Sequence, residues 1–265
     1  MRHSRPFVLS ALLLALFGFS GSGLAGSFDL EFNQDGVLPS SQGFTYETGF
    51  GGPVLDEKSV FSVTGGSLHM NTLGTSGVAI YSLPQGGAMA YKASSDASLE
   101  WSMRGNSIGQ VGFSVLLNDG VGPAKGNIYV EFSFGSTIQF DTRAQNTPGG
   151  SLSSIPFNSV DGLFHTYRLT TSAADGSFKF FIDPSVNPNP VKTGSLGPGS
   201  TLTDSPESIY FGDATTSGGD ASVVLDYIRF VNVPEPGVCM LAPAFAVFLM
   251  MKRRRAIQSA SAFAA

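Results

Sequence analysis

The chain has 265 residues, of which 13% are charged, with 15 Lys and Arg against 20 Asp and Glu. Six of the basic residues and one acid lie in the two terminal segments described below, so the segment 26–232 keeps 9 basic and 19 acidic residues and a net charge of −10. Such an acidic segment repels nucleic acid and anionic lipid, which excludes nucleic-acid binding and favours neutral partners or cations.

Residues 1–25 have the order of a secretory signal peptide. Arg2 and Arg5 form a positively charged start, an uncharged apolar run follows, and small residues precede a cleavage site. We expect cleavage between Ala25 and Gly26, so that the mature chain is exported.

The segment 26–232 is predicted to be one all-β domain. Short runs rich in β-branched and aromatic residues alternate with clusters of Gly, Pro, Asn, Asp and Ser. The predicted strands cover residues 28–32, 59–63, 67–71, 77–83, 97–104, 109–117, 126–135, 164–171, 178–182, 208–211 and 221–231. Period-2 alternation in so many short strands predicts two antiparallel sheets packed face to face, with the 22 Phe residues as the main core filler.

Two features of the connections can also be predicted. Gly65 and Gly66 lie between two predicted strands, which indicates a tight hairpin. The stretches 141–162 and 183–204 are rich in Pro and Gly and are predicted to be surface loops.

Four motifs follow one another in the C-terminal part of this domain. They are DGLFHTYRL at 161–169, FKFFID at 178–183, IYFGD at 209–213 and VLDYIRF at 224–230. Their order resembles the C-terminal half of a concanavalin A-like lectin/glucanase jelly roll, as in laminin-G-like and laminarinase-like domains. The resemblance implies a two-sheet antiparallel jelly-roll sandwich and carbohydrate as the class of ligand.

The segment 233–265 has three ordered parts. It begins with the motif Val233, Pro234, Glu235, Pro236, which is stiff and extended because each proline fixes φ and lacks an N–H group. Residues 237–251 carry no charge and are predicted to form a single transmembrane helix, shorter than the usual span. The basic cluster that follows, which marks the cytoplasmic side, consists of Lys252, Arg253, Arg254 and Arg255.

This C-terminal order resembles the PEP-CTERM sorting signal of Gram-negative bacteria, which a membrane protease called exosortase processes. The resemblance implies recognition at the motif 233–236, a transient anchor in the inner membrane, and delivery to the cell surface or extracellular matrix. The partners it implies are exosortase and the secretion machinery. The alternative is an ordinary single-pass anchor with a basic flank.

Enzymes that the predicted fold resembles cleave β-glucans with carboxylates spaced Glu-x-Asp-x-Glu on one strand, where alternate residues project to the same face. That spacing is absent from the chain: Asp29 and Glu31 form the nearest pair, and Glu100 and Glu131 are isolated acids in predicted strands. We therefore expect no catalytic residues and a non-catalytic domain that binds extracellular polysaccharide. The alternatives are a divergent polysaccharide hydrolase or lyase and an inert structural component of the matrix.

Trp101 is the candidate for direct contact with a sugar. It is the only Trp of the chain and follows Glu100 in a predicted strand. An aromatic ring in that position either stacks on a sugar or anchors the core, and a single Trp in a β-sandwich is typical of the second role.

No cofactor is expected, apart from a structural calcium ion that the jelly-roll resemblance implies. Asp226, near the end of the domain, is the candidate ligand, with Asp29 or Glu31 as further ones; alternatively, Asp226 pairs with Arg229 or faces solvent. A zinc site is not expected, because the segment has two histidines far apart and no cysteine. We expect His165 to pack or to form an inter-strand hydrogen bond.

Overall fold

The computed structural model describes residues 26–49, 52–84, 89–108, 112–119, 128–141, 153–198, 207–215 and 219–233. The predicted signal peptide, the prolines of the sorting motif, the predicted transmembrane helix and the basic cluster lie outside these residues. Within the described ranges, no helix is both long enough and apolar enough to cross a membrane.

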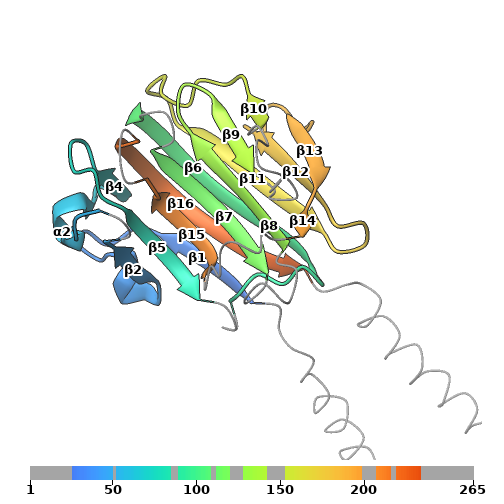
Figure 1. Ribbon diagram of the computed structural model, residues 1–265, viewed down its shortest axis with the longest axis horizontal. Coiled ribbons are helices and arrows are strands. Elements are labelled where there is room, and N and C mark those ends of the chain that lie inside the picture. The colour runs from blue at the N-terminus through green and yellow to red at the C-terminus, as the bar shows by residue number, and fades with distance from the viewer. Residues whose placement is uncertain are drawn as a thin grey trace, which may run out of the picture. The chain divides into compact units, whose positions relative to one another are not determined.

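The described strands form two antiparallel sheets (Figure 1). Sheet A has the order β13 (Lys192–Ser195), β12 (Ser177–Ile182), β11 (His165–Ser172), β6 (Asp96–Ile108), β16 (Ala221–Val233), β4 (Ser67–Asn71) and β3 (Phe61–Thr64), with β1 (Ser27–Glu31) also paired to β16. Sheet B has the order β10 (Ser153–Ile155), β9 (Ile138–Asp141), β8 (Ile128–Phe134), β7 (Phe113–Asp119), β15 (Glu207–Asp213), β5 (Ala79–Pro84) and β2 (Thr45–Thr48), with β14 (Gly197–Pro198) paired to β8. The helical turns η1 (Pro39–Gln42) and α2 (Glu57–Val60) precede strands at the margin.

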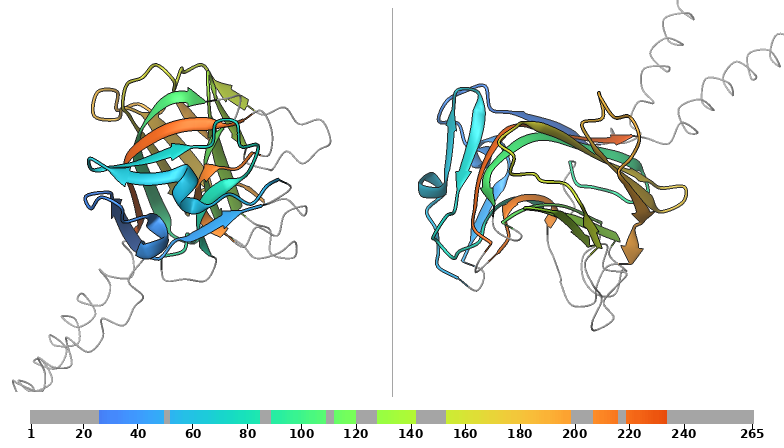
Figure 2. Two further views of the ribbon diagram at one scale, coloured as in Figure 1. Left: turned by 90° about the vertical axis from the view of Figure 1, so that its left-hand side faces the viewer. Right: turned by 90° about the horizontal axis from the view of Figure 1, so that it is seen from above.

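The two sheets lie face to face, and sheet A arches over sheet B (Figure 2). Their inner faces are built by alternation: on β11, Tyr167 and Leu169 are buried while Arg168 between them is only partly covered. Aromatic rings join the layers, since Phe132 of β8 stacks on Phe180 of β12 with ring centroids 4.0 Å apart. The predicted all-β sandwich with an aromatic core is confirmed.

Trp101 belongs to this core. Its side chain is fully buried, stacks on Tyr167 with centroids 5.7 Å apart and meets Phe134 edge-on at 5.8 Å. A sugar could reach the indole only if the sandwich opened. The residue therefore anchors the core, and the alternative role as a ligand-binding surface does not fit the structure.

The hairpin predicted between β3 and β4 is confirmed, with φ of +60° at Gly65 and +79° at Gly66. A two-residue turn with both central φ angles positive matches the twist of the flanking strands and favours glycine at both positions.

Three predictions about local structure were wrong. Ser59 and Val60 lie in α2 rather than in a strand, because the chain makes one helical turn after Asp56 before β3 begins. The predicted loop 141–162 contains β10, and the predicted loop 183–204 contains β13 and β14. These strands are short and pair at sheet edges, so their backbone hydrogen bonds define them more than any apolar pattern does.

Candidate functional site

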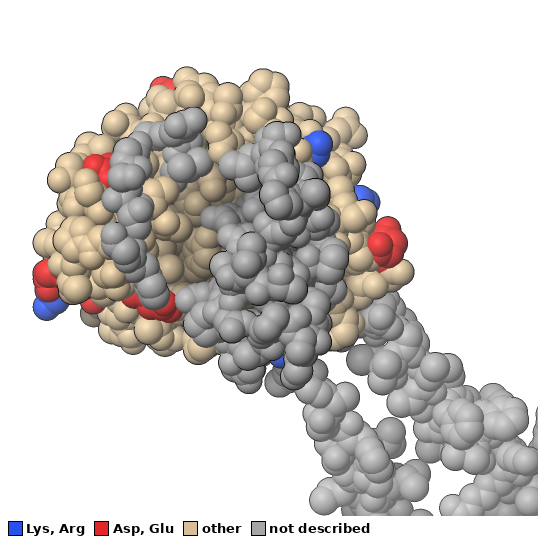
Figure 3. Space-filling model, in the orientation of Figure 1, with Lys and Arg blue, Asp and Glu red and all other residues tan. Residues whose placement is uncertain are grey.

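The outer face of sheet B is hollowed, and the hollow faces the viewer in Figure 3. Strands β5, β15, β7 and β8 lie side by side behind it, in that order within the sheet. On each strand, one set of alternate residues enters the core and the other set turns to the hollow. We call eight members of the second set the floor: Val78, Ile80, Ser82, Ser114, Leu116, Asn118, Ser133 and Tyr210.

The centre of the floor is apolar. Val78, Ile80, Leu116 and Tyr210 form a buried cluster that is separate from the main core. The strand register explains how they meet, because Tyr210 on β15 lies opposite Leu116 on β7 and opposite Ser82 on β5. The sheet thus carries an apolar cluster on the face opposite its core.

The margin of the floor is polar and hydroxyl-rich. Ser114 Oγ and Ser133 Oγ lie 3.0 Å apart on β7 and β8, and Asn118 is fully buried on β7. Ser82 Oγ donates a hydrogen bond to the carboxylate of Glu47, which stands at the β2 edge. None of these eight residues carries a charge, but Glu131 holds the alternate position of β8 between the core residues Val130 and Phe132, as Ser133 does between Phe132 and Phe134. The uncovered surface inside the hollow shows neither Lys and Arg nor Asp and Glu, apart from acids at one margin (Figure 3).

A concave surface with an apolar centre and a few polar groups is the usual form of a small-molecule or sugar site. The C–H faces of a sugar ring pack on apolar side chains, while its hydroxyls exchange hydrogen bonds with hydroxyl and amide groups. Of the eight floor residues, Ser133 is partly exposed and the other seven are at most 9% accessible, so Ser133 is the one that a sugar in the hollow can contact most directly. The eight uncharged floor residues suit a neutral ligand, since an unpaired charge is costly to cover.

Glu100, one of the two isolated strand acids, lies on the wrong face for catalysis in the hollow. This residue of β6 is directed to the outer face of sheet A, where Arg168 Nη2 lies 2.6 Å from its Oε2 and the Tyr227 hydroxyl donates to its Oε1 at 3.1 Å. The carboxylate has a structural ion pair and cannot reach a ligand in the hollow.

Glu131, the other isolated acid, is on β8 of sheet B. Its backbone pairs in register with Leu116 of the floor on one side and with Asp141 of β9 on the other. The side chains of Glu131 and Asp141 lie outside the part of the structure that is described.

The three residues predicted as calcium ligands, Asp226, Asp29 and Glu31, do not come together to form a metal site. Arg229 binds both first-strand acids, with Nε 2.9 Å from Asp29 Oδ1 and Nη2 2.6 Å from Glu31 Oε1, while Asp226 is exposed. These contacts lower the pKa of Glu31, chiefly through the hydrogen bond from Arg229. Among the described residues no three His, Cys, Asp or Glu side chains are grouped as metal ligands, so this donor set does not fit the ion.

His165 makes more than an inter-strand contact. Each of its ring nitrogens faces an aspartate, Asp161 on one side and Asp183 on the other. This cluster lies in sheet A and its connections, whereas the floor belongs to sheet B, so the two are separate features of the molecule.

The floor could have been found only in part from the sequence. The run 113–119 alternates Phe113, Val115 and Leu117 with Ser114, Leu116 and Asn118, so its two faces can be separated by period 2. Leu116 obscures the difference between the core face and the outer face of β7. An apolar residue on the outer face gives the strand the sequence pattern of one that is buried on both faces.

No family model matches the chain, and no curated protein matches it in sequence. Solved structures are similar in fold. An endo-1,3-β-glucanase from Streptomyces sioyaensis has 14% identity and a TM-score of 0.50, over 80% of this chain and 98% of that one. A pseudo β-1,3-glucanase and immunostimulatory antigen from Mycobacterium tuberculosis has 14% identity and a TM-score of 0.51, over 80% and 99%. A glycoside hydrolase family protein from Mycobacterium thermorestibile has 15% identity and a TM-score of 0.51, over 77% and 99%.

At this level of identity the similarity shows the fold alone. The chain has a two-sheet antiparallel jelly-roll sandwich of the kind seen in β-1,3-glucanases and glycoside-hydrolase-like proteins. The fold that the resemblance implied is thereby confirmed, and its function needs separate support from the site.

Proposed function

We propose that this protein binds a neutral polysaccharide in the hollow of sheet B and does not cleave it. The observation that carries the proposal is the hollow, whose eight floor residues carry no charge and combine an apolar cluster around Tyr210 with hydroxyl and amide groups. The Glu-x-Asp-x-Glu spacing that hydrolysis would use in this fold is absent from the chain. The net charge of −10 in the segment 26–232 also disfavours acidic polysaccharides.

The similar structures include proteins named as β-1,3-glucanases and one named as a pseudo β-1,3-glucanase. This supports a glucan-like ligand as the first class to test. The structural similarity does not distinguish binding from hydrolysis. That distinction depends on whether the chain has the carboxylates that hydrolysis requires.

Hydrolysis is the second candidate, and one observation favours it. Glu131 and Asp141 are directly opposite each other on β8 and β9. Opposite positions of an antiparallel pair are neighbours on one face of a sheet. If this pair is catalytic, Glu131→Gln and Asp141→Asn should each abolish release of reducing ends from a β-glucan.

We also propose that the protein is exported and sorted to the cell surface or extracellular matrix. The support is the three-part order of the segment 233–265 together with the signal-peptide pattern of residues 1–25. A polysaccharide-binding domain is consistent with a signal for delivery to the cell surface, because such ligands are extracellular.

A blocking substitution tests the site. Ser133 on the floor and Ser98 on the outer face of sheet A are both partly buried serines on strands. We expect Ser133→Trp to fill the hollow and to weaken binding on a polysaccharide array at least about tenfold, a loss of about 1.4 kcal/mol, while Ser98→Trp binds like the parent protein. Equal binding by both variants would refute the hollow as the site, and no binding by the parent protein would favour the inert matrix role.

A further inference from the structure

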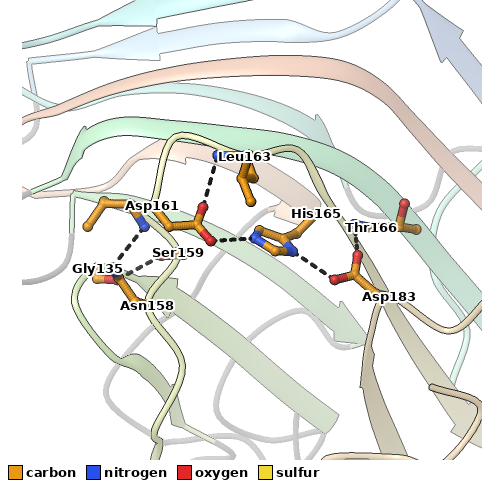
Figure 4. Close-up of polar contacts among 9 residues, drawn as sticks. Gly135, Asn158, Ser159, Asp161, Leu163, His165, Thr166 and Asp183 are labelled. Carbon is orange, nitrogen blue, oxygen red and sulfur yellow. Dashed lines mark hydrogen bonds and ion pairs between the residues drawn. The ribbon is translucent and has the colours of Figure 1, made fainter. Parts of the chain in front are cut away.

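His165 lies between two carboxylates at the start of β11 (Figure 4). Its Nδ1 is 2.7 Å from Asp183 Oδ2, and its Nε2 is 3.0 Å from Asp161 Oδ2. An ionised carboxylate only accepts hydrogen bonds, and a neutral imidazole donates from only one nitrogen. Both contacts are therefore hydrogen bonds only while the ring is a protonated imidazolium.

The two aspartates belong to different segments of the chain. Asp183 directly follows β12, and its Oδ1 accepts a hydrogen bond from the Thr166 N–H at 2.9 Å. Asp161 lies in the connection between β10 and β11, and its Oδ1 accepts from the Leu163 N–H at 2.9 Å. The imidazolium thus ties this connection to the end of the β11–β12 hairpin.

The connection is fixed on its N-terminal side independently of the histidine. Ser159 is buried, and its Oγ donates to the Gly135 carbonyl at 2.7 Å while its N–H donates to the same carbonyl at 3.3 Å. The turn 161–164 that follows is exposed, with Leu163 62% and Phe164 45% accessible. The contact between Asp161 and His165 closes this exposed turn.

We propose that Asp161, His165 and Asp183 form a pH-sensitive latch, which holds the turn 161–164 against the β11–β12 hairpin while the ring is protonated and releases it when the ring loses a proton. After that loss, one nitrogen lone pair faces a carboxylate oxygen. The attraction at that nitrogen becomes repulsion, and the turn that carries Leu163 and Phe164 loses its closing contact.

The surroundings of the ring set the direction of its titration. Among the described residues, the charged groups that act on it are Asp161 and Asp183. Arg104 of β6 lies over the adjacent Phe164, with its guanidinium 5.1 Å from that ring's centroid. Phe157 packs edge-on against the imidazole at 4.9 Å. Burial lowers the pKa of His165, but the hydrogen bonds with Asp183 and Asp161 together outweigh burial, so its pKa is raised.

The sign of the pH effect follows from this shift. A histidine with a raised pKa in the folded state contributes stability that is complete below its unfolded pKa of about 6.5 and is lost as the pH rises through the folded pKa. The latch is therefore closed in acid and opens towards alkaline pH.

Hydrogen–deuterium exchange of the full chain, followed by mass spectrometry, tests the latch. The two conditions are about pH 5.5 and about pH 8.5, roughly one unit below and two units above the ordinary histidine pKa. After correction for the intrinsic pH dependence of exchange, protection of the peptide 160–166 should fall about tenfold at the higher pH. Protection of a peptide within β6 should not change. Equal corrected protection at both pH values would overturn the proposal.

Two substitutions at one position make the test specific. In Asp161→Asn, the side-chain oxygen still accepts from the Leu163 N–H and the amide can donate to the neutral ring, so protection should stay high at both pH values. In Asp161→Ala, protection should be low at both. Asp175→Asn, at an exposed aspartate that accepts from the Ser177 N–H, is the matched control and should keep the pH step. An unchanged pH step in Asp161→Asn would overturn the assignment.

Discussion

The Thr72 hydroxyl and the Asp213 carboxylate lie 2.5 Å apart and join the two sheets. Thr72 directly follows β4 of sheet A, whereas Asp213 ends β15 of sheet B. Both side chains are fully buried, and the Thr72 hydroxyl also accepts from the Ala221 N–H at 2.9 Å. This small polar junction fixes one sheet against the other at the ends of β4 and β15.

Removal of the hydroxyl should therefore be costly. We expect Thr72→Val to lower the free energy of unfolding by about 1–3 kcal/mol, because it leaves a buried carboxylate oxygen and a buried N–H without this partner. Thr170→Val, at a partly buried position on β11, is the matched control and should change stability by less than about 0.5 kcal/mol. Urea unfolding at neutral pH measures the change in unfolding free energy of each variant. Equal decreases for Thr72→Val and Thr170→Val would show that the junction has no special role.

The junction also predicts a pH dependence. Burial raises the pKa of Asp213, helped by the nearby Asp220 and opposed by hydrogen bonds from Thr215 and Thr72. Between the unfolded pKa of about 3.9 and the raised folded value, the folded state binds more protons, so this group's contribution to stability falls as pH rises.

Asp213→Asn isolates that contribution. The difference in unfolding free energy between the parent protein and Asp213→Asn should shift in favour of the variant as the pH rises through this window. The exposed Asp226→Asn serves as control and should follow the parent protein. Parallel curves for Asp213→Asn and the parent protein would contradict a titrating buried carboxylate.

Trp101 gives a spectroscopic test of the core. Because it is the only Trp in the chain and is fully buried, its emission reports on this site alone. We expect weak quenching by acrylamide in the folded protein, a red shift on unfolding, and no change on adding a polysaccharide that binds. Quenching by the polysaccharide would place the ligand at the indole instead of in the hollow.

The sorting proposal rests on the segment 233–265 and predicts a change of location. Deletion of this segment should release the protein from the cell surface fraction into the medium, because the anchor and the processing motif are lost together. Replacement of Pro234 and Pro236 by Ala should leave an unprocessed, membrane-bound chain. Fractionation and immunoblotting follow both, and unchanged location and size after the deletion would contradict the proposal.

The strands with clear alternation can be predicted from the sequence, and those without it cannot. On β11 and β12 the period of two is regular, and the predicted bounds lie within about two residues of the observed ones. The edge strands β2 (Thr45–Thr48) and β13 (Lys192–Ser195) are short and contain few apolar residues. They exist because a neighbouring strand offers hydrogen bonds, which local sequence does not reveal.

The site is harder to predict than the fold for a physical reason. Alternation separates the two faces of a strand, but it does not show which sheet is hollowed on its outer side. Glu100 and Ser133 are both outward on strands, yet only Ser133 faces the hollow. The cluster around His165 depends on the β11–β12 pairing, in which Tyr167 lies opposite Ile182 and so brings Asp183 beside the histidine.

The most direct test of polysaccharide binding without cleavage measures both in one sample. The purified segment 26–233, which contains both sheets, is incubated with a neutral β-1,3-glucan while retention on the polysaccharide and release of reducing ends are followed together. We predict retention that Ser133→Trp weakens at least about tenfold, that added salt does not weaken, and that is accompanied by no new reducing ends. Release of reducing ends that disappears in Glu131→Gln would contradict this prediction and would establish a hydrolase.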